Sequence, residues 1–188
     1  MKRTLILSFV LLAVISVNAQ SWTLDKNHAK LGFVATHLLV SDVEGKFKNF
    51  DVAVVSSKDD FSDAQVNLSA DINSINTDND YRDNDLKSEK FFDAAKYPTL
   101  SFKSTSITKV DAKNYKLNGN LTMHGITKPV SLDLVLNGIV QNPMSKKTVA
   151  GFKIKGTLKR TDFGIASSFP TSVVSDEIVI DSNVELNK

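Results

Sequence analysis

Residues 64–72 read Ala-Gln-Val-Asn-Leu-Ser-Ala-Asp-Ile, so every second side chain is apolar and every intervening one is polar. Successive side chains of a β-strand point to opposite faces, and this spacing therefore predicts a strand with one buried and one solvated face. Leu68 lies in the middle of the apolar set and is expected to point inward. The same alternation recurs at residues 31–37, 115–123, 130–134, 152–159 and 178–186.

The apolar face changes parity once along the chain. The apolar set occupies odd-numbered positions up to Phe47 and resumes on even-numbered positions at Phe50. A strand that continued regularly would turn its apolar residues to the solvent after such a shift. An extra residue restores the facing, so the sequence predicts a β-bulge or a turn at residues 48–49.

About eight amphipathic strands in succession predict an all-β protein, either a closed antiparallel barrel or a sandwich, and closure removes exposed strand edges. Residues 79–95 are charged, lack the alternation and carry Leu86, so they predict a short helical segment across a barrel mouth or along its side. Inward candidates mix large residues such as Phe33 with small ones such as Gly45. This mixture fits either a packed interior or a cavity.

The N-terminus indicates export. Lys2 and Arg3 precede an apolar run at residues 5–17, and Val17 and Ala19 occupy the small-residue positions of a cleavage site. We therefore expect residues 1–19 to be a signal peptide, residues 20–188 to be the mature chain, and the location to be periplasmic or secreted. An uncleaved anchor helix is the alternative. The mature chain has a length typical of one domain.

The charge balance argues against two classes of partner. Removal of Lys2 and Arg3 takes Lys+Arg from 23 to 21, which equals the 21 Asp+Glu. A mature chain of net charge near zero lacks the basic surface that nucleic-acid binding requires. It also has no general attraction to anionic membranes, and no stable membrane insertion is expected.

The sequence offers little support for catalysis or metal binding. It contains no cysteine, no Gly-x-Ser-x-Gly elbow and no carboxylate pair on one predicted inner face. Of its histidines, His28 falls in a loop, His37 on an apolar strand face and His124 on a polar one, so they are not expected to share an ion. Residues 78–89 resemble a calcium loop but have a cation at the fifth position and no glycine at the sixth. We expect no enzyme activity, no metal and no cofactor.

Several fragments carry a resemblance to a known family, namely HAKLGF at residues 28–33, VEGKF at 43–47, RDNDLKS at 82–88, YPTLSF at 97–102, GNLTMHGITKPV at 119–130 and RTDFGI at 160–165. In this fixed order they resemble the YceI-like family of polyisoprenoid-binding proteins, and the likeness covers essentially the whole mature chain. The resemblance implies an extended, eight-stranded, lipocalin-like antiparallel barrel that holds an isoprenoid chain in an apolar tunnel. It also implies a periplasmic or secreted protein.

The leading hypothesis is a non-catalytic carrier or store for a polyisoprenoid, an isoprenoid quinone or a similar long amphiphilic lipid. His37, on the inner parity of its strand, is a candidate for head-group contact. Two alternatives remain: a haem-binding or catalytic barrel that uses His37, and a filled barrel that acts as a stress or interaction protein without a ligand. The oligomeric state stays open, with a homodimer among the options. The expected cavity residues are Phe33, Phe47, Leu68, Phe102, Leu121, Leu134, Phe152 and Phe163.

Overall fold

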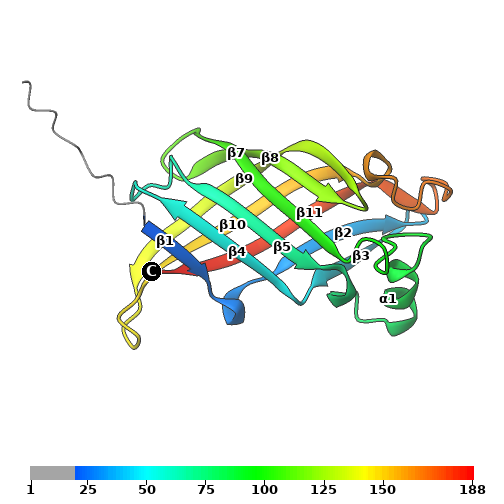
Figure 1. Ribbon diagram of the computed structural model, residues 1–188, viewed down its shortest axis with the longest axis horizontal. Helices are drawn as coiled ribbons and strands as arrows, with labels where there is room; N and C mark the ends of the chain where they lie inside the picture. The colour runs from blue at the N-terminus through cyan, green and yellow to red at the C-terminus, as the bar shows by residue number, and fades with distance from the viewer. Residues whose placement is uncertain (1–19) are drawn as a thin grey trace, which may run out of the picture.

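A computed structural model describes residues 20–188 as a closed antiparallel barrel of eight strands (Figure 1). The alternating segment at residues 64–72 forms strand β5 (Gln65–Asp71) of this barrel. The expected signal peptide lies outside the described residues. Among residues 20–188, no helix is both long and apolar enough to cross a membrane.

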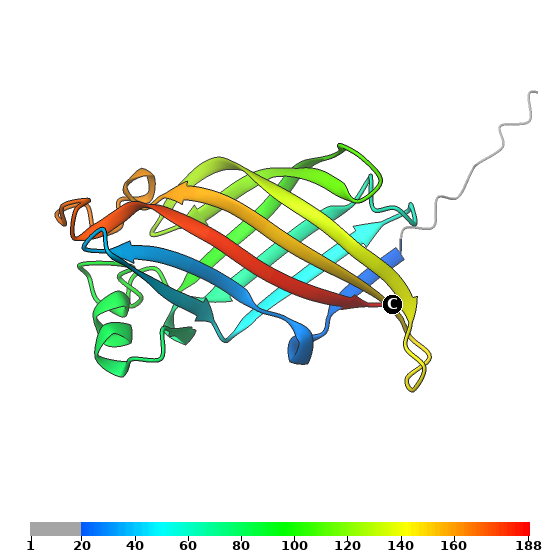
Figure 2. The same ribbon diagram turned by 180° about the vertical axis from the view of Figure 1, so that it is seen from behind.

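Eleven strand segments build the barrel wall because the first three barrel strands are each interrupted. Antiparallel pairing joins all neighbours, and β2, β11, β10 and β9 lie side by side in the wall seen in Figure 2. The other strands are β1 (Gln20–Leu24), β2 (Leu31–His37), β3 (Ser41–Phe47), β4 (Phe50–Ser56), β6 (Ile75–Asn76), β7 (Thr99–Lys109), β8 (Asn114–Met123), β9 (Ile126–Gln141), β10 (Thr148–Lys159) and β11 (Val174–Asn187).

The parity change predicted after Phe47 is confirmed. Strand β3 ends at Phe47, residues 48–49 bend, and β4 begins at Phe50. Both phenylalanines are buried, as the extra residue requires. Strand β4 then pairs with β1 and β5, whereas β3 pairs with β2 and β6, so the two segments act as one bent barrel strand.

The barrel closes where β11 pairs with both β1 and β2. Leu186 lies opposite Leu24 of β1, and Ile180 lies opposite Phe33 of β2. The short 3-10 helix η1 (Lys26–His28) separates β1 from β2, and Asp25 caps it by accepting a hydrogen bond from the Asn27 amide. One long strand therefore completes the barrel against two short ones.

The predicted helical segment contains one helix, α1 (Asp80–Lys87), followed by turns up to the start of β7. Asn79 caps α1, because its side-chain oxygen accepts from the Arg82 amide at 3.0 Å. The buried Asp83 carboxylate accepts from the amide and the hydroxyl of Thr77, at 2.8 and 2.6 Å. These bonds fasten the helix to the chain that leaves β6.

The two ends of the barrel are built differently (Figure 1). At the closed end, the Phe61 ring centroid lies 4.9 Å from those of both Trp22 and Phe152. The Tyr115 hydroxyl donates to the Asp60 carbonyl at 2.7 Å and fastens the loop that carries Phe61. The opposite end, called the loop end below, carries α1, the β2–β3 turn and residues 160–174, including the 3-10 helix η3 (Arg160–Phe163).

Candidate ligand cavity

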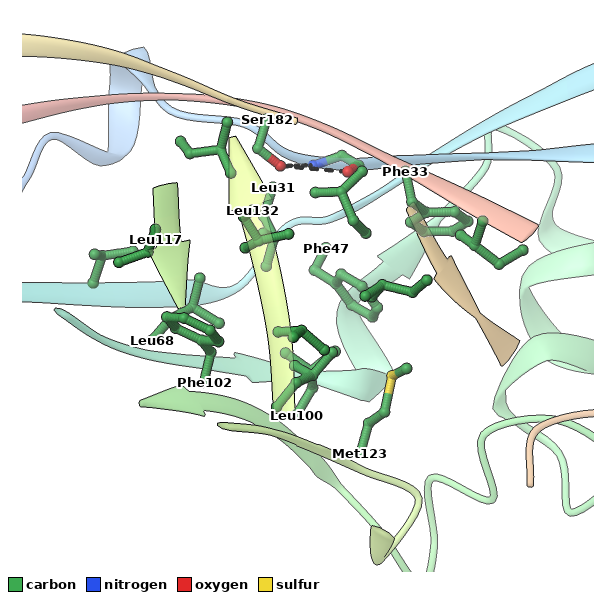
Figure 3. Close-up of a pocket in the computed structure, with 18 of the residues that line it drawn as sticks. Leu31, Phe33, Phe47, Leu68, Leu100, Phe102, Leu117, Met123, Leu132 and Ser182 are labelled. Atoms are coloured by element: carbon green, nitrogen blue, oxygen red, sulfur yellow. Dashed lines mark hydrogen bonds between the residues drawn. The ribbon is translucent and has the colours of Figure 1, made fainter. Parts of the chain in front are cut away.

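The inward faces of the strands enclose a cavity of about 230 Å³. Among residues 20–188, every side chain that lines it apart from Ser182 and Arg160 is a hydrocarbon or a thioether, or the residue is a glycine. Leu68, Phe102 and Leu117 approach it from one side in Figure 3, and Leu31 and Phe33 from another. The interior is therefore neither a packed core nor a polar pocket.

Both polar residues of the lining have their hydrogen-bonding groups occupied by the protein. The Ser182 hydroxyl accepts from the Gly32 amide at 3.0 Å and donates to the Gly32 carbonyl at 3.3 Å (Figure 3). The buried Arg160 guanidinium donates to five carbonyls, which uses all five of its N–H groups. Its acceptors, at 2.5–3.1 Å, are the carbonyl oxygens of Ser175, Ile165, Ala166, Phe169 and Val174. Neither side chain has a donor left for a ligand.

Seven of the eight predicted cavity residues line the cavity, namely Phe33, Phe47, Leu68, Phe102, Leu121, Leu134 and Phe152. The eighth prediction, Phe163, is wrong: this side chain is buried but does not line the cavity. Phe163 belongs to the 3-10 helix η3 that follows β10, so no strand alternation fixes the direction of its side chain.

The expectation that His37 points into the barrel is also wrong. His37 has the inner parity of β2, but it is the last residue of that strand, is exposed, and does not line the cavity. None of the described residues that line the cavity is a histidine. The haem alternative therefore loses the axial ligand on which it was based.

His124 does not lie on a solvated strand face as predicted. It forms, with Gly125, the two-residue turn between β8 and β9, and both residues have positive φ. Its Nδ1 lies 3.0 Å from the Phe163 carbonyl oxygen, and its ring packs edge-on against Tyr97 at 4.8 Å. His124 is a structural residue that connects this turn to η3.

Glycines determine where the large inward side chains lie. A Cβ at Gly45 would sit 2.2 Å from Cζ of Phe33, and a Cβ at Gly119 would sit 2.3 Å from Cζ of Phe102. Each ring thus occupies the space above a glycine on the neighbouring strand. Since the rings lie against the wall, the axis of the barrel stays open.

The loop end contributes lining residues that strand alternation could not identify. Leu86 of α1 and the following Phe91 and Phe92 reach the cavity, as do Ile165 and Arg160 from the opposite loop. The apolar residues of the α1 segment were visible in its otherwise charged sequence. Arg160 gave no such signal, because its five acceptors lie in residues 165–175, which only the folded chain places around it.

A group of metal-ligand atoms lies outside the barrel, next to η1. Nδ1 of His28 is 3.1 Å from Oδ2 of Asp25 and 3.9 Å from Oε2 of Glu185. The hydrogen bond to Asp25 raises the pKa of His28, and the same bond lowers the pKa of Asp25. Since Asp25 also caps η1, these contacts are explained as a fastening of the break between β1 and β2 to β11. Glu185 is far from His28 in the sequence, so only the folded chain brings its carboxylate next to the histidine.

The fold and the cavity define a lipocalin-like barrel with an apolar interior. Residues 22–186 match the model of the YceI-like domain. The UPF0312 protein SAB2563 of Staphylococcus aureus is 39% identical over 145 residues, which cover 77% of this chain and 82% of that protein. The chain belongs to the YceI-like family.

Solved structures agree with this assignment. The Campylobacter jejuni YCEI protein matches with a TM-score of 0.72 at 32% identity, covering 81% of this chain and 89% of that one. A polyisoprenoid binding domain from Saccharophagus degradans, implicated in plant cell wall breakdown, matches with a TM-score of 0.65 at 16% identity. That match covers 88% of this chain and 97% of the domain, and it is a likeness of fold.

Proposed function

We propose that this protein is an exported, non-catalytic carrier or store for a long lipid with an isoprenoid-like tail, such as a polyisoprenoid or an isoprenoid quinone. The observation that carries the proposal is the cavity itself, which is lined by apolar side chains and by two polar ones whose hydrogen bonds are internal. Burial of apolar ligand surface contributes about 25 cal/mol per Å², so a tail is held without any polar contact.

Two further points support the proposal. A structural neighbour is named as a polyisoprenoid binding domain, and the chain belongs to the same family as YCEI proteins. Among the described residues that line the cavity, Ser182 is the one with a hydroxyl, and this hydroxyl is bonded on both sides to Gly32. The proposal of export is supported by the N-terminal sequence pattern. The head group of the lipid is expected to stay at the loop end.

The test is mass spectrometry of a solvent extract from gently purified mature protein. A long-chain lipid in near-stoichiometric amount is the expected result. The control is the same protein unfolded in denaturant, washed free of lipid and refolded. Its solvent extract should contain no lipid, and the refolded protein should bind the lipid again when the lipid is added. A folded parent protein that yields no lipid and takes up none from a membrane extract would refute the proposal and favour an interaction protein.

A further inference from the structure

Two neighbouring segments at the loop end contain no charged residue, although 23% of the chain is charged. They are residues 38–41, from the β2–β3 turn to the first residue of β3, and residues 163–174, from the last residue of η3 to the first residue of β11. The Leu38 amide donates to the Val173 carbonyl at 3.0 Å, and His37 lies opposite Val174 in the pairing of β2 with β11. We call these two segments together the uncharged tip.

The uncharged tip exposes large apolar side chains. Leu38, Leu39 and Val40 are 51%, 67% and 82% exposed. Leu38 and Leu39 also have φ of 50° and 60°, a left-handed backbone that Gly, Asn and Asp adopt with less strain. An exposed turn with this backbone ordinarily carries such polar or small residues. The leucines thus serve neither the core nor the turn, and their apolar surface is free to contact a partner.

The same end of the barrel is where the cavity meets the loops. Ile165 and Val174 of the uncharged tip line the cavity from inside, and Phe169 packs against Phe91 at 5.0 Å between ring centroids. Phe91 itself lines the cavity from the α1 side. The Trp22–Phe61–Phe152 cluster occupies the other end of the barrel, so the uncharged tip lies at the end where loops, and not this aromatic cluster, border the cavity.

We propose that the uncharged tip docks on the surface of a lipid bilayer, so that the cargo passes between bilayer and cavity without crossing water. Apolar side chains and hydroxyls enter the interfacial region of a bilayer at low cost, whereas charged groups there must lose hydration. A tip without charge complements a zwitterionic surface and gains nothing from anionic lipid. The transfer of cargo rests on the function proposed above, but docking is measurable without cargo.

The experiment measures how much mature protein, residues 20–188, floats with phosphatidylcholine vesicles. The test variant is Leu39→Asp, which places a charge on the tip at a backbone conformation that Asp tolerates. The matched control is Met144→Asp. Met144 is 88% exposed and lies in the β9–β10 hairpin at the closed end (Figure 1). We expect Leu39→Asp to weaken vesicle binding at least about tenfold, because the variant loses the leucine side chain that the docked parent buries in the bilayer. Met144→Asp should bind like the parent.

Other outcomes distinguish a zwitterionic bilayer from an anionic bilayer or a protein as the partner of the uncharged tip. Binding that appears only with phosphatidylserine in the vesicles, or that disappears at high salt, would overturn the proposal because it would be electrostatic. Equal binding by the two variants, or a parent that does not float, would also overturn it, and the latter would favour a protein partner for the tip.

The extracted lipid per protein separates docking from cargo binding. Leu39→Asp should keep its lipid, because Leu39 does not line the cavity. Its rate of lipid transfer to phosphatidylcholine vesicles should fall with its vesicle binding. A parent that floats but carries no lipid would refute the carrier function and leave docking intact.

Discussion

Leu68→Phe narrows the cavity from the middle of β5. Leu68 lies opposite Val52 of β4 and Phe102 of β7, and all three side chains line the cavity. The larger side chain therefore has no room on the wall and extends toward the axis. The matched control is Gln65→Phe, which adds a phenylalanine to the exposed outer face of the same strand.

The expected loss of affinity follows from the space that the ring takes. Phenylalanine adds about three carbon atoms to leucine, which displace about three methylene groups of a tail worth about 0.8 kcal/mol each. The sum of about 2.4 kcal/mol corresponds to about fiftyfold weaker binding. Overpacking of the wall is expected to lower the free energy of unfolding by about 1–3 kcal/mol.

The assay combines thermal unfolding, which checks that both variants are folded, with mass spectrometry of the lipid extracted per protein. Competition with a fluorescent long-chain probe then gives the change in Kd. We expect weaker binding and less lipid in Leu68→Phe, and parent values in Gln65→Phe. Equal lipid content and equal Kd in the two folded variants would refute an internal site at β5.

Three further changes test individual contacts. Gly45→Ala should push the Phe33 ring toward the axis, which reduces the extracted lipid and lowers the free energy of unfolding in urea by about 1–3 kcal/mol. Unchanged stability would contradict the distance of 2.2 Å between a Cβ at residue 45 and Cζ of Phe33. Arg160→Lys leaves carbonyls of the surrounding residues unpaired. We therefore expect the free energy of unfolding to fall by at least about 1.5 kcal/mol and amide exchange in residues 165–174 to become faster. Amide exchange like that of the parent would count against this role of Arg160. Asp25→Asn keeps a good helix cap but should lower the pKa of His28 from its raised value, leaving the smaller effect of Glu185, as NMR titration would record. Because the raised pKa belongs to the folded state, the pair of His28 and Asp25 stabilises the protein below the ordinary histidine pKa, and the effect is lost as pH rises through the folded pKa. The variant should show a weaker dependence of stability on pH in this range.

Predictions from alternation succeeded inside regular strands and failed where a strand ends. Leu68 and Phe102 lie within β5 and β7, where the backbone fixes the side of each residue, and both face the cavity. His37 is the last residue of β2, His124 lies in a turn, and Phe163 lies in a 3-10 helix. At those three places the period of two no longer applies, so the alternation of a neighbouring strand does not fix where the side chain lies.

The local sequence by itself determined which residues form the inner face of each strand and where the face shifts after Phe47, because the direction of a side chain depends on the extended backbone of its own segment. Whether the inner face encloses a cavity was decided by tertiary structure alone. The open axis depends on Phe33 lying over Gly45 and Phe102 over Gly119, and these contacts require the register between neighbouring strands. The loop end likewise depends on the carbonyls that gather around Arg160. Space between strands is shared by side chains from different segments, so no single segment contains the information that sets its volume.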